Sequence, residues 1–465
     1  MRDLVTDYLV VGAGASGMAF VDSVISESDA EVIVVDRRHR PGGHWLDAYP
    51  FVRLHQPSAY YGVPSSPLGR DRIDTTGVNA GFYERATAPE ICSYFGDVLE
   101  QNFVASGRVR FLAMCDYRGS DADGHHVVSL LSGEECTIRV RRRFVDATYV
   151  ESSIPSRHTP AYSVDQGVRL VPPNDLVGLA EAPAGFTVLG CGKTAMDTCN
   201  WLLDTGVDPD RIQWVRPRDP WLFNRACMQP LELVGAYVQM QARWVEACAY
   251  AEDGRDFARR LEGDGVFVRI NPSIEPDVFR GATISTAEMD ALATIERVVR
   301  AGKVRRIASN RMILDDAEVP ADPRTLYVDC TAQGVRPTAP RPVYDGERIT
   351  LQYVTIGIVP WSTATIGAIE ALRDDDAERN RLTPVVGFTG HIDDVLGAAH
   401  AGMTGIAARS AEPDIAAWNG RCRLDPARAA TGRTEDPEIA AAFDSVVANF
   451  GRAMHNLSTK VTTTV

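Results

Sequence analysis

The sequence predicts an α/β protein with two Rossmann-like dinucleotide-binding domains, the second inserted into the first, and a helical C-terminal region. The main observation is a pair of glycine-rich fingerprints, Gly12-Ala13-Gly14-Ala15-Ser16-Gly17 and Gly190-Cys191-Gly192-Lys193-Thr194-Ala195. Each follows a short apolar run and precedes a helical stretch, which is the strand–turn–helix context that the motif requires. A second β-rich strand follows each helix and completes a βαβ unit.

The residue that ends the second strand differs between the two units. The first strand ends in Asp36, whose carboxylate accepts hydrogen bonds from a ribose diol in such folds. The corresponding strand of the second unit ends in Arg216, and Arg218 follows. A guanidinium at this point would pair with a 2′-phosphate. The pair therefore predicts an FAD site followed by an NADPH site. The alternative is two ordinary βαβ units that bind no nucleotide.

Composition narrows the class of protein. The 465 residues are 45% hydrophobic and 24% charged, as in ordinary globular proteins. The net charge of −14 disfavours nucleic acids and anionic membranes as partners. No apolar run is long enough for a membrane span, no signal peptide fits, and the nine cysteines lack a disulfide framework, so we expect a cytoplasmic protein. The absence of CxxC and CxxxxC pairs disfavours a thiol–disulfide reductase.

Four segments are expected along the chain. Residues 1–165 are the first part of the FAD-binding domain, 166–324 the NADPH-binding domain with a helical insertion at about 226–295, 325–391 the second part of the FAD-binding domain, and 392–465 the helical C-terminal region. Periodicity and turn residues predict the following elements: an irregular stretch at 51–85, a helix at 88–104, strands at 108–113, 125–131 and 136–147, one or two helices at 232–262, a strand at 349–358 and a helix at 363–373. The helices at 232–262 either pack on the second domain or cap the site.

Five further features accompany the fingerprints: Asp36, the turn Arg40-Pro41-Gly42-Gly43-His44-Trp45, Ala86-Thr87-Ala88-Pro89-Glu90-Ile91, Val109-Arg110-Phe111 and Asp146-Ala147-Thr148. Together they make residues 5–375 resemble the flavin-containing monooxygenase superfamily, whose members use NADPH and dioxygen. Three places depart from that pattern. Lys193-Thr194 replaces Asn-Ser, His55 stands where many members have an asparagine near the flavin, and residues 151–183 lack a Phe-x-Gly followed by His. The last two of these departures concern the oxygenation chemistry rather than the cofactors.

The resemblance implies that the flavin ring lies where the two domains meet. His55 or Gln56, the expected catalytic residues, would hydrogen-bond flavin N5 or a peroxide on carbon 4a; the alternative for His55 is a ring bonded to loop backbone. Ser362 or Thr363 would cap a helix that points at the flavin, with Thr389 to Asp394 as the alternative. The full set of expected cofactor-binding residues is Gly12, Gly14, Ala15, Ser16, Gly17, Asp36, Arg37, Gly43, His44, Trp45, His55, Cys115, Thr148, Gly190, Gly192, Lys193, Thr194, Arg216, Arg218, Ser362 and Thr363.

The function expected from these features is an FAD- and NADPH-dependent monooxygenase. It would insert one oxygen atom from O2 into the nitrogen, sulfur or carbonyl group of a small organic substrate through a flavin C4a-hydroperoxide. The first alternative is an NADPH-dependent flavin oxidoreductase that makes no oxygenated product, and the second is a non-catalytic flavin-fold binding protein. No metal site is expected, and the sequence leaves a homodimer open.

Overall fold

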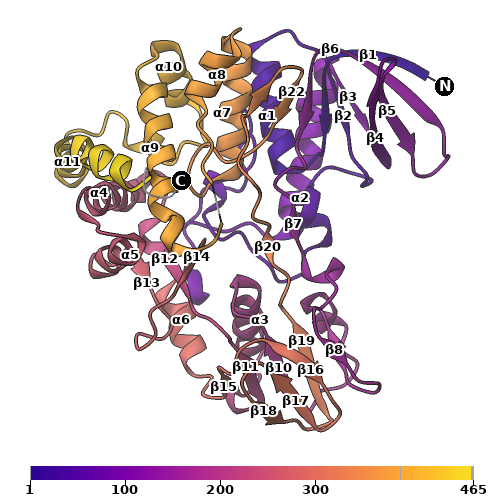
Figure 1. Cartoon of the computed structure of the whole chain (residues 1–465), viewed down its shortest axis with the longest axis vertical. Helices are drawn as coiled ribbons and strands as arrows, with labels where there is room; N and C mark the ends of the chain where they lie inside the picture. Colours follow the sequence, from indigo (N-terminus) through magenta and orange to yellow (C-terminus); the bar gives the residue numbers. More distant parts are fainter. Residues whose placement is uncertain (1, 388, 462–465) are drawn as a thin grey trace.

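The computed structural model describes residues 2–387 and 389–461. The first domain forms the upper lobe of Figure 1 around an eight-stranded sheet with the path β21-β22-β6-β1-β2-β3, to which β4 and β5 add a meander beside β6. Its strands are β1 (Arg2–Val11), β2 (Val32–Val35), β3 (Val109–Leu112), β4 (Cys115–Asp121), β5 (Gly124–Ser129), β6 (Glu135–Asp146), β21 (Tyr344–Asp345) and β22 (Arg348–Thr350). Its helices are α1 (Ala15–Glu27), α2 (Ala88–Asp97), α7 (Val359–Leu372) and α8 (Asp376–Leu382).

The parallel centre of this sheet is buried on both faces. β1 pairs in parallel with β2 and β6, and Leu9 and Val10 on β1 are fully buried. Such burial explains the unbroken apolar run in the sequence. On one face α1 packs against α7, where a Cβ at Gly367 would lie only 2.7 Å from the carbonyl oxygen of Phe20. This close contact between the helices therefore requires a glycine.

The second domain forms the lower lobe around a five-stranded parallel sheet with the order β15-β11-β10-β19-β9. Its strands are β9 (Leu170–Val171), β10 (Gly185–Leu189), β11 (Ile212–Val215), β15 (Val298–Val299) and β19 (Thr325–Asp329), and its helices are α3 (Lys193–Asp204) and α6 (Thr286–Ala293). A smaller sheet at the edge of the lobe consists of β8 (Ser163–Val164), β16 (Val304–Ile307), β17 (Arg311–Leu314) and β18 (Glu318–Pro320).

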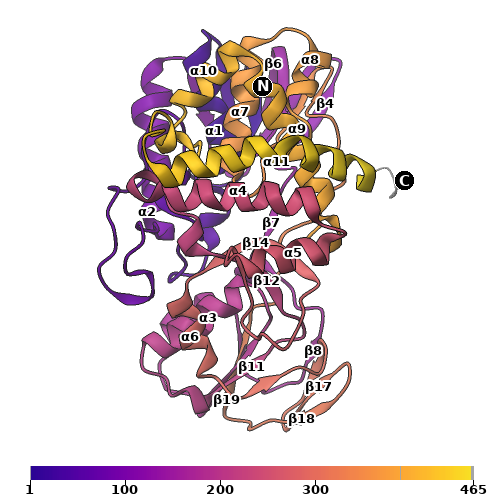
Figure 2. The same cartoon turned by 90° about the vertical axis from the view of Figure 1, so that its left-hand side faces the viewer.

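The insertion and the C-terminal helices share one hydrophobic core. The insertion comprises β12 (Pro220–Asn224), β13 (Phe267–Val268), β14 (Val278–Ile284), α4 (Val234–Tyr250) and α5 (Gly254–Gly263), and the C-terminal helices are α9 (Val395–Ser410), α10 (Pro413–Arg421) and α11 (Pro437–Val461). The long helix α11 runs alongside α4 across the molecule (Figure 2). Buried residues of both segments, such as Trp244 and Ile439, belong to the same cluster. The helices at 232–262 are thus two, and they pack largely on the C-terminal region.

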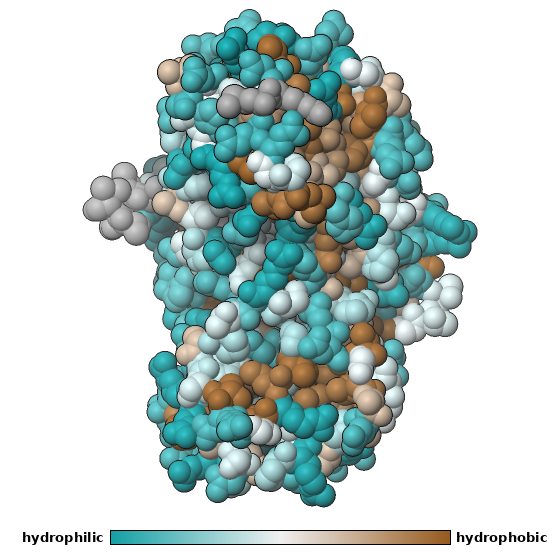
Figure 3. Space-filling view, turned by 90° about the vertical axis from the view of Figure 1, so that its right-hand side faces the viewer, coloured by the Kyte–Doolittle hydropathy of each residue, from teal (hydrophilic) through white to brown (hydrophobic). Residues whose placement is uncertain are grey.

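Two short strands connect the lobes. β7 (Ser152–Ser153) and β20 (Gly334–Val335) pair antiparallel where the chain leaves the first domain and where it returns. Seen from the side, polar side chains cover most of both lobes, and an apolar band crosses the lower one (Figure 3). None of the helices in the described residues combines the length and the apolar composition of a membrane span.

Three expected boundaries differ from the structure. The sequence predicts that 325–391 belongs to the first domain, but Thr325–Asp329 (β19) pairs with β10 in the second sheet, and the chain rejoins the first sheet only at Tyr344. The pattern of a buried strand does not say which of two parallel sheets it joins. The strand expected at 349–358 is only three residues long, and α7 begins at Val359 rather than 363 because Pro360 favours the first helical turn.

Candidate functional site

A cleft of about 1600 Å³ opens between the two domains and the insertion. Its walls include the carboxyl ends of β1 and β10, which is where ligands bind in open parallel sheets. The predicted site residues that line it are Gly12, Gly14, Ala15, Ser16, Asp36, Arg37, Gly43, His44, Trp45, His55, Gln56, Cys115, Thr148, Gly190, Gly192, Lys193, Thr194 and Arg218. Four predicted site residues, Gly17, Arg216, Ser362 and Thr363, do not contribute to the lining.

The first fingerprint forms a tight turn that brings two backbone segments together. Gly12 has a φ of +110°, and the backbones at Gly14 and Gly43 approach so closely that a Cβ on Gly43 would lie 2.9 Å from the Cα of Gly14. Asp36 accepts hydrogen bonds from the amides of Ala13 (2.7 Å) and Arg38 (2.8 Å), so its carboxylate is held at the cleft wall. Gly17 packs α1 on this turn and does not line the cleft.

Aromatic side chains continue the wall beyond this turn. The Trp45 indole N–H donates to the Tyr61 hydroxyl (2.6 Å), and the ring of His44 lies 5.0 Å from that of Trp45. Burial lowers the pKa of His44 to about 4, so its ring is neutral at physiological pH. On the opposite side the Thr148 hydroxyl donates to Asp146 (2.8 Å). The first site is therefore pre-formed by contacts within the protein.

His55 reaches the same cleft from an irregular loop. Its carbonyl oxygen accepts a hydrogen bond from the Thr283 hydroxyl of β14. Within residues 2–387 and 389–461, the His55 ring has no hydrogen-bond partner, in contrast to the alternative of a ring bonded to loop backbone. Burial and, next, the charge of Lys193 lower the pKa of His55 to about 4. The ring is thus a neutral group at the wall of the cleft.

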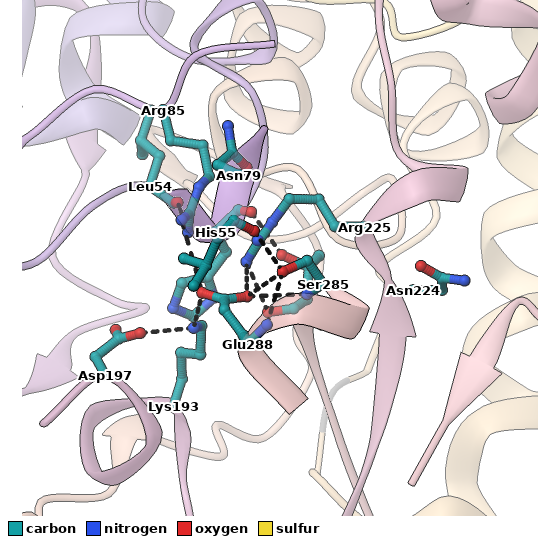
Figure 4. A network of polar contacts seen from close by, with 12 residues as sticks. Leu54, His55, Asn79, Arg85, Lys193, Asp197, Asn224, Arg225, Ser285 and Glu288 are labelled. Atoms are coloured by element: carbon teal, nitrogen blue, oxygen red, sulfur yellow. Dashed lines mark hydrogen bonds and ion pairs between the residues drawn. The ribbon is translucent and has the colours of Figure 1, made fainter. Parts of the chain in front are cut away.

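A buried cluster of charges lies behind His55 (Figure 4). Glu288, 2% exposed, lies 2.5 Å from Arg225, 3.3 Å from the ammonium of Lys193 and 3.6 Å from Arg85. These cations lower the pKa of Glu288 to about 2 despite its burial. Lys193 also pairs with Asp197 at 2.6 Å. The charge of Lys193, expected to face a pyrophosphate, is therefore compensated within the protein.

The cluster draws its members from three parts of the chain. Arg85 belongs to the first domain, where it donates to the carbonyl oxygen of Leu54 (3.3 Å), Lys193 opens α3 in the second domain, and Arg225 follows β12 in the insertion. No local sequence pattern joins residues so far apart, which is why sequence reasoning missed Glu288.

The two arginines after β11 have different surroundings. Arg216 is 3% exposed, lies 2.5 Å from Asp219 and stacks on Trp214, so its assignment to a 2′-phosphate is wrong in this structure. Arg218 is exposed and lines the cleft. The sequence did contain a sign that Arg216 would turn inward, because Asp219 follows three residues later and can pair with it. The exposed cation Lys303, which sequence reasoning missed, lines the cleft as well.

Helix α7 points at the cleft without the expected cap. Ser362 is fully buried, exchanging a hydrogen bond with Thr355 (2.7 Å), and Thr363 donates to carbonyl oxygens of its own helix. Neither residue is the N-cap, because the helix begins one turn earlier, after Ile358. The first turn itself, at Val359 and Pro360, lines the cleft, and so does the alternative segment from Thr389 to Asp394.

A family model described as an NAD(P)-binding Rossmann-like domain matches residues 10–60, which include the first fingerprint. The "uncharacterized protein Rv2000" of Mycobacterium tuberculosis is 42% identical over 429 residues, which cover 91% of this chain and 78% of the relative, and the same values hold for Mb2023 of Mycobacterium bovis. The chain belongs to the family of these mycobacterial proteins.

Solved structures relate this family to a known fold. An oxidised steroid monooxygenase bound to NADP aligns with a TM-score of 0.52 at 15% identity, over 79% of this chain and 85% of the other. A flavin monooxygenase from Stenotrophomonas maltophilia aligns with a TM-score of 0.50 at 13% identity, over 80% of this chain and 98% of the other. The predicted α/β fold is confirmed as the fold that this chain shares with these two solved monooxygenases.

Proposed function

We propose that this protein is an FAD- and NADPH-dependent monooxygenase that acts on a small organic substrate. The observation that carries the proposal is that three helices, α1, α3 and α7, begin at the wall of one cleft, each without a side-chain cap. Uncapped helix N-termini offer free amide donors and the positive end of the helix dipole, which favour phosphates and other anions. The phosphates of the two dinucleotides would lie at the starts of α1 and α3, and the negatively charged reduced flavin ring would lie at the start of α7.

The residues present fit the two cofactors. The close approach of Gly14 and Gly43 and the held carboxylate of Asp36 form a cradle for FAD, with Arg37, Trp45, Cys115 and Thr148 around it. Gly190, with a φ of +132° and Cys330 packed against it, forms the second cradle. Beside that cradle Arg218 and Lys303 would hold the 2′-phosphate that distinguishes NADPH from NADH.

FAD, when bound, supplies the transfer of two electrons from NADPH to dioxygen. The net reaction places one oxygen atom on a nitrogen, sulfur or carbonyl group of the substrate and releases the other as water. The start of α7 stabilises negative charge at the site, Trp45 excludes water as an apolar wall, and the neutral His55 ring donates or accepts a hydrogen bond.

Rapid mixing tests the proposal. The FAD-loaded protein is mixed with NADPH without oxygen, then with oxygenated buffer and a panel of amines, sulfides and ketones, while spectra are recorded; NADH serves as the matched control. Loss of the oxidised flavin spectrum with NADPH, a delay of seconds before it returns, and oxygenated product support the proposal. Immediate return with one hydrogen peroxide per NADPH for every compound identifies an oxidoreductase without oxygenation instead. If NADPH leaves the spectrum unchanged, the second site is wrongly assigned.

Replacing His55 by Ala is expected to uncouple the reaction. If the ring hydrogen-bonds the reacting part of the flavin, its loss should raise the ratio of hydrogen peroxide to product about tenfold or more, the effect of one hydrogen bond to a charged or strongly polar group. NADPH consumption and product are measured together. His55→Asn, which keeps a hydrogen-bonding side chain, should restore part of the coupling, and His39→Ala, at an exposed position outside the cleft, should change nothing. Unchanged coupling in His55→Ala would remove this residue from the mechanism.

A further inference from the structure

Arg280 on β14 is a half-buried cation that lines the cleft. Among the residues that the structure describes, no carboxylate lies within 4.0 Å of its guanidinium. The same holds for Arg53 and Arg218 in this cleft, whereas Arg37, Arg38 and Arg157 have such partners. Desolvating a charge without an ion partner is costly unless a ligand compensates it. The position of Arg280 therefore calls for an anion.

The side chain of Arg280 is held in place by backbone rather than by charge. Its guanidinium donates a hydrogen bond to the carbonyl oxygen of Val335 on β20. Gly390 lies against it, since a Cβ there would be 3.4 Å from the Cγ of Arg280 and 3.6 Å from its Cζ. The amide of Phe279 donates to the carbonyl oxygen of Gly390 (3.1 Å), which fixes the strand to this segment. The guanidinium is thus oriented before any ligand arrives.

The groups that face Arg280 show what kind of anion fits. Burial is the largest cause that lowers the pKa of Arg280, and the positive charge of Arg218 lowers it further. Cys191 and Tyr353 raise the pKa of Arg280. Cys191 stands between the two glycines of the second fingerprint, where the backbone approaches a pyrophosphate. Arg218 follows β11 and Arg280 belongs to the insertion, and both line the same cleft as Cys191. Among the described residues, neither guanidinium has a carboxylate within 4.0 Å.

We infer that Arg280 binds the pyrophosphate of the nicotinamide cofactor, so that the insertion closes over the second cradle, while Arg218 serves the 2′-phosphate. This inference rests on the proposed function, because it requires a dinucleotide in the second site. Guanidinium pairs well with phosphate oxygens in a planar, two-bond geometry, and a phosphate would also relieve the repulsion between Arg218 and Arg280. The pyrophosphate is common to NADPH and NADH, whereas the 2′-phosphate is not.

Calorimetric titration of the FAD-loaded protein with NADP⁺ and NAD⁺ separates these roles. Arg280→Gln should raise the Kd for both nucleotides by a similar factor of about 10 to 100, as expected for a hydrogen-bonded charge pair. Arg218→Gln should raise the Kd for NADP⁺ more than that for NAD⁺. Arg280→Lys should weaken binding less than Arg280→Gln. Arg259→Gln, at an exposed position of α5 outside the cleft, is the matched control. Flavin content and the unfolding midpoint confirm that each variant is folded.

Several outcomes overturn the inference. An unchanged Kd for both nucleotides in Arg280→Gln would show that Arg280 contacts neither cofactor. A selective loss of NADP⁺ binding would place it at the 2′-phosphate instead. Normal nucleotide binding with loss of product would assign it to the substrate. In each case the wild-type protein still binds NADP⁺, so the proposed function stands; absence of binding by the wild type would instead overturn that function.

Discussion

Replacing Glu288 by Gln is expected to destabilise the protein by about 3 to 5 kcal/mol, the cost of removing one partner from a buried ion pair. The carboxylate is the shared counter-ion of Arg85, Lys193 and Arg225, none of which is exposed enough for water to replace it. Its loss would leave three buried cations against Asp197 alone. The urea midpoint, followed by tryptophan fluorescence, measures the effect.

Asp322→Asn is the matched control for this substitution. Asp322 and Glu288 both have a pKa lowered to about 2 by neighbouring donors and cations, but Asp322 pairs with Arg324 on the surface. Solvent screens that pair, so its removal should move the midpoint far less. Equal shifts for the two variants would contradict the argument, because they would show that burial does not set the contribution of Glu288.

The same carboxylate predicts a pH dependence. The pKa of Glu288 is about 2 in the folded protein and 4.5 when unperturbed, so the unfolded chain binds the proton more readily. Its contribution to stability is therefore fully present above about pH 4.5 and is lost as the pH falls towards 2. Over that window the midpoint of the Gln variant should fall less steeply than that of the wild type.

Gly17→Ala is expected to have the second large effect, because the added Cβ would lie 2.0 Å from the carbonyl oxygen of Gly12. That oxygen belongs to the turn that forms the first cradle, so α1 and the turn must separate. Overpacking of this kind costs about 3 kcal/mol or more, and flavin retention should fall with it. Gel filtration followed by flavin absorbance measures the FAD content per chain.

Gly96→Ala provides the control for backbone effects of a glycine substitution in a helix. A Cβ at Gly96, near the end of α2, would have no neighbour within 4 Å. Ala should be neutral there or stabilise the protein by up to about 1 kcal/mol through the unfolded state. Full flavin content in Gly17→Ala would contradict this prediction, because it would show that the third glycine of the first fingerprint has no steric role.

Sequence reasoning found the parts of the site that local pattern determines. Most residues of the two fingerprints, together with Asp36 and Gly43 to Trp45, line the cleft as expected, because a strand followed by a glycine turn and a helix constrains its own geometry. It failed where tertiary contacts decide. Arg216 turned inward to Asp219, Ser362 became a core residue, and β19 joined the second sheet. Arg280 reaches the cleft and Glu288 reaches its ion-pair partners only because distant strands and helices bring them there.

The pair formed by β7 and β20 has a mechanical consequence. The lobes are joined there by two short strands, and the cluster around Glu288 ties together the first domain, the second domain and the insertion. The hydrogen bond from the Tyr49 hydroxyl to Asp197 (2.8 Å) adds another connection between the lobes. A rigid swing of one lobe must break some of these contacts, which limits how far a ligand held between the lobes can be carried.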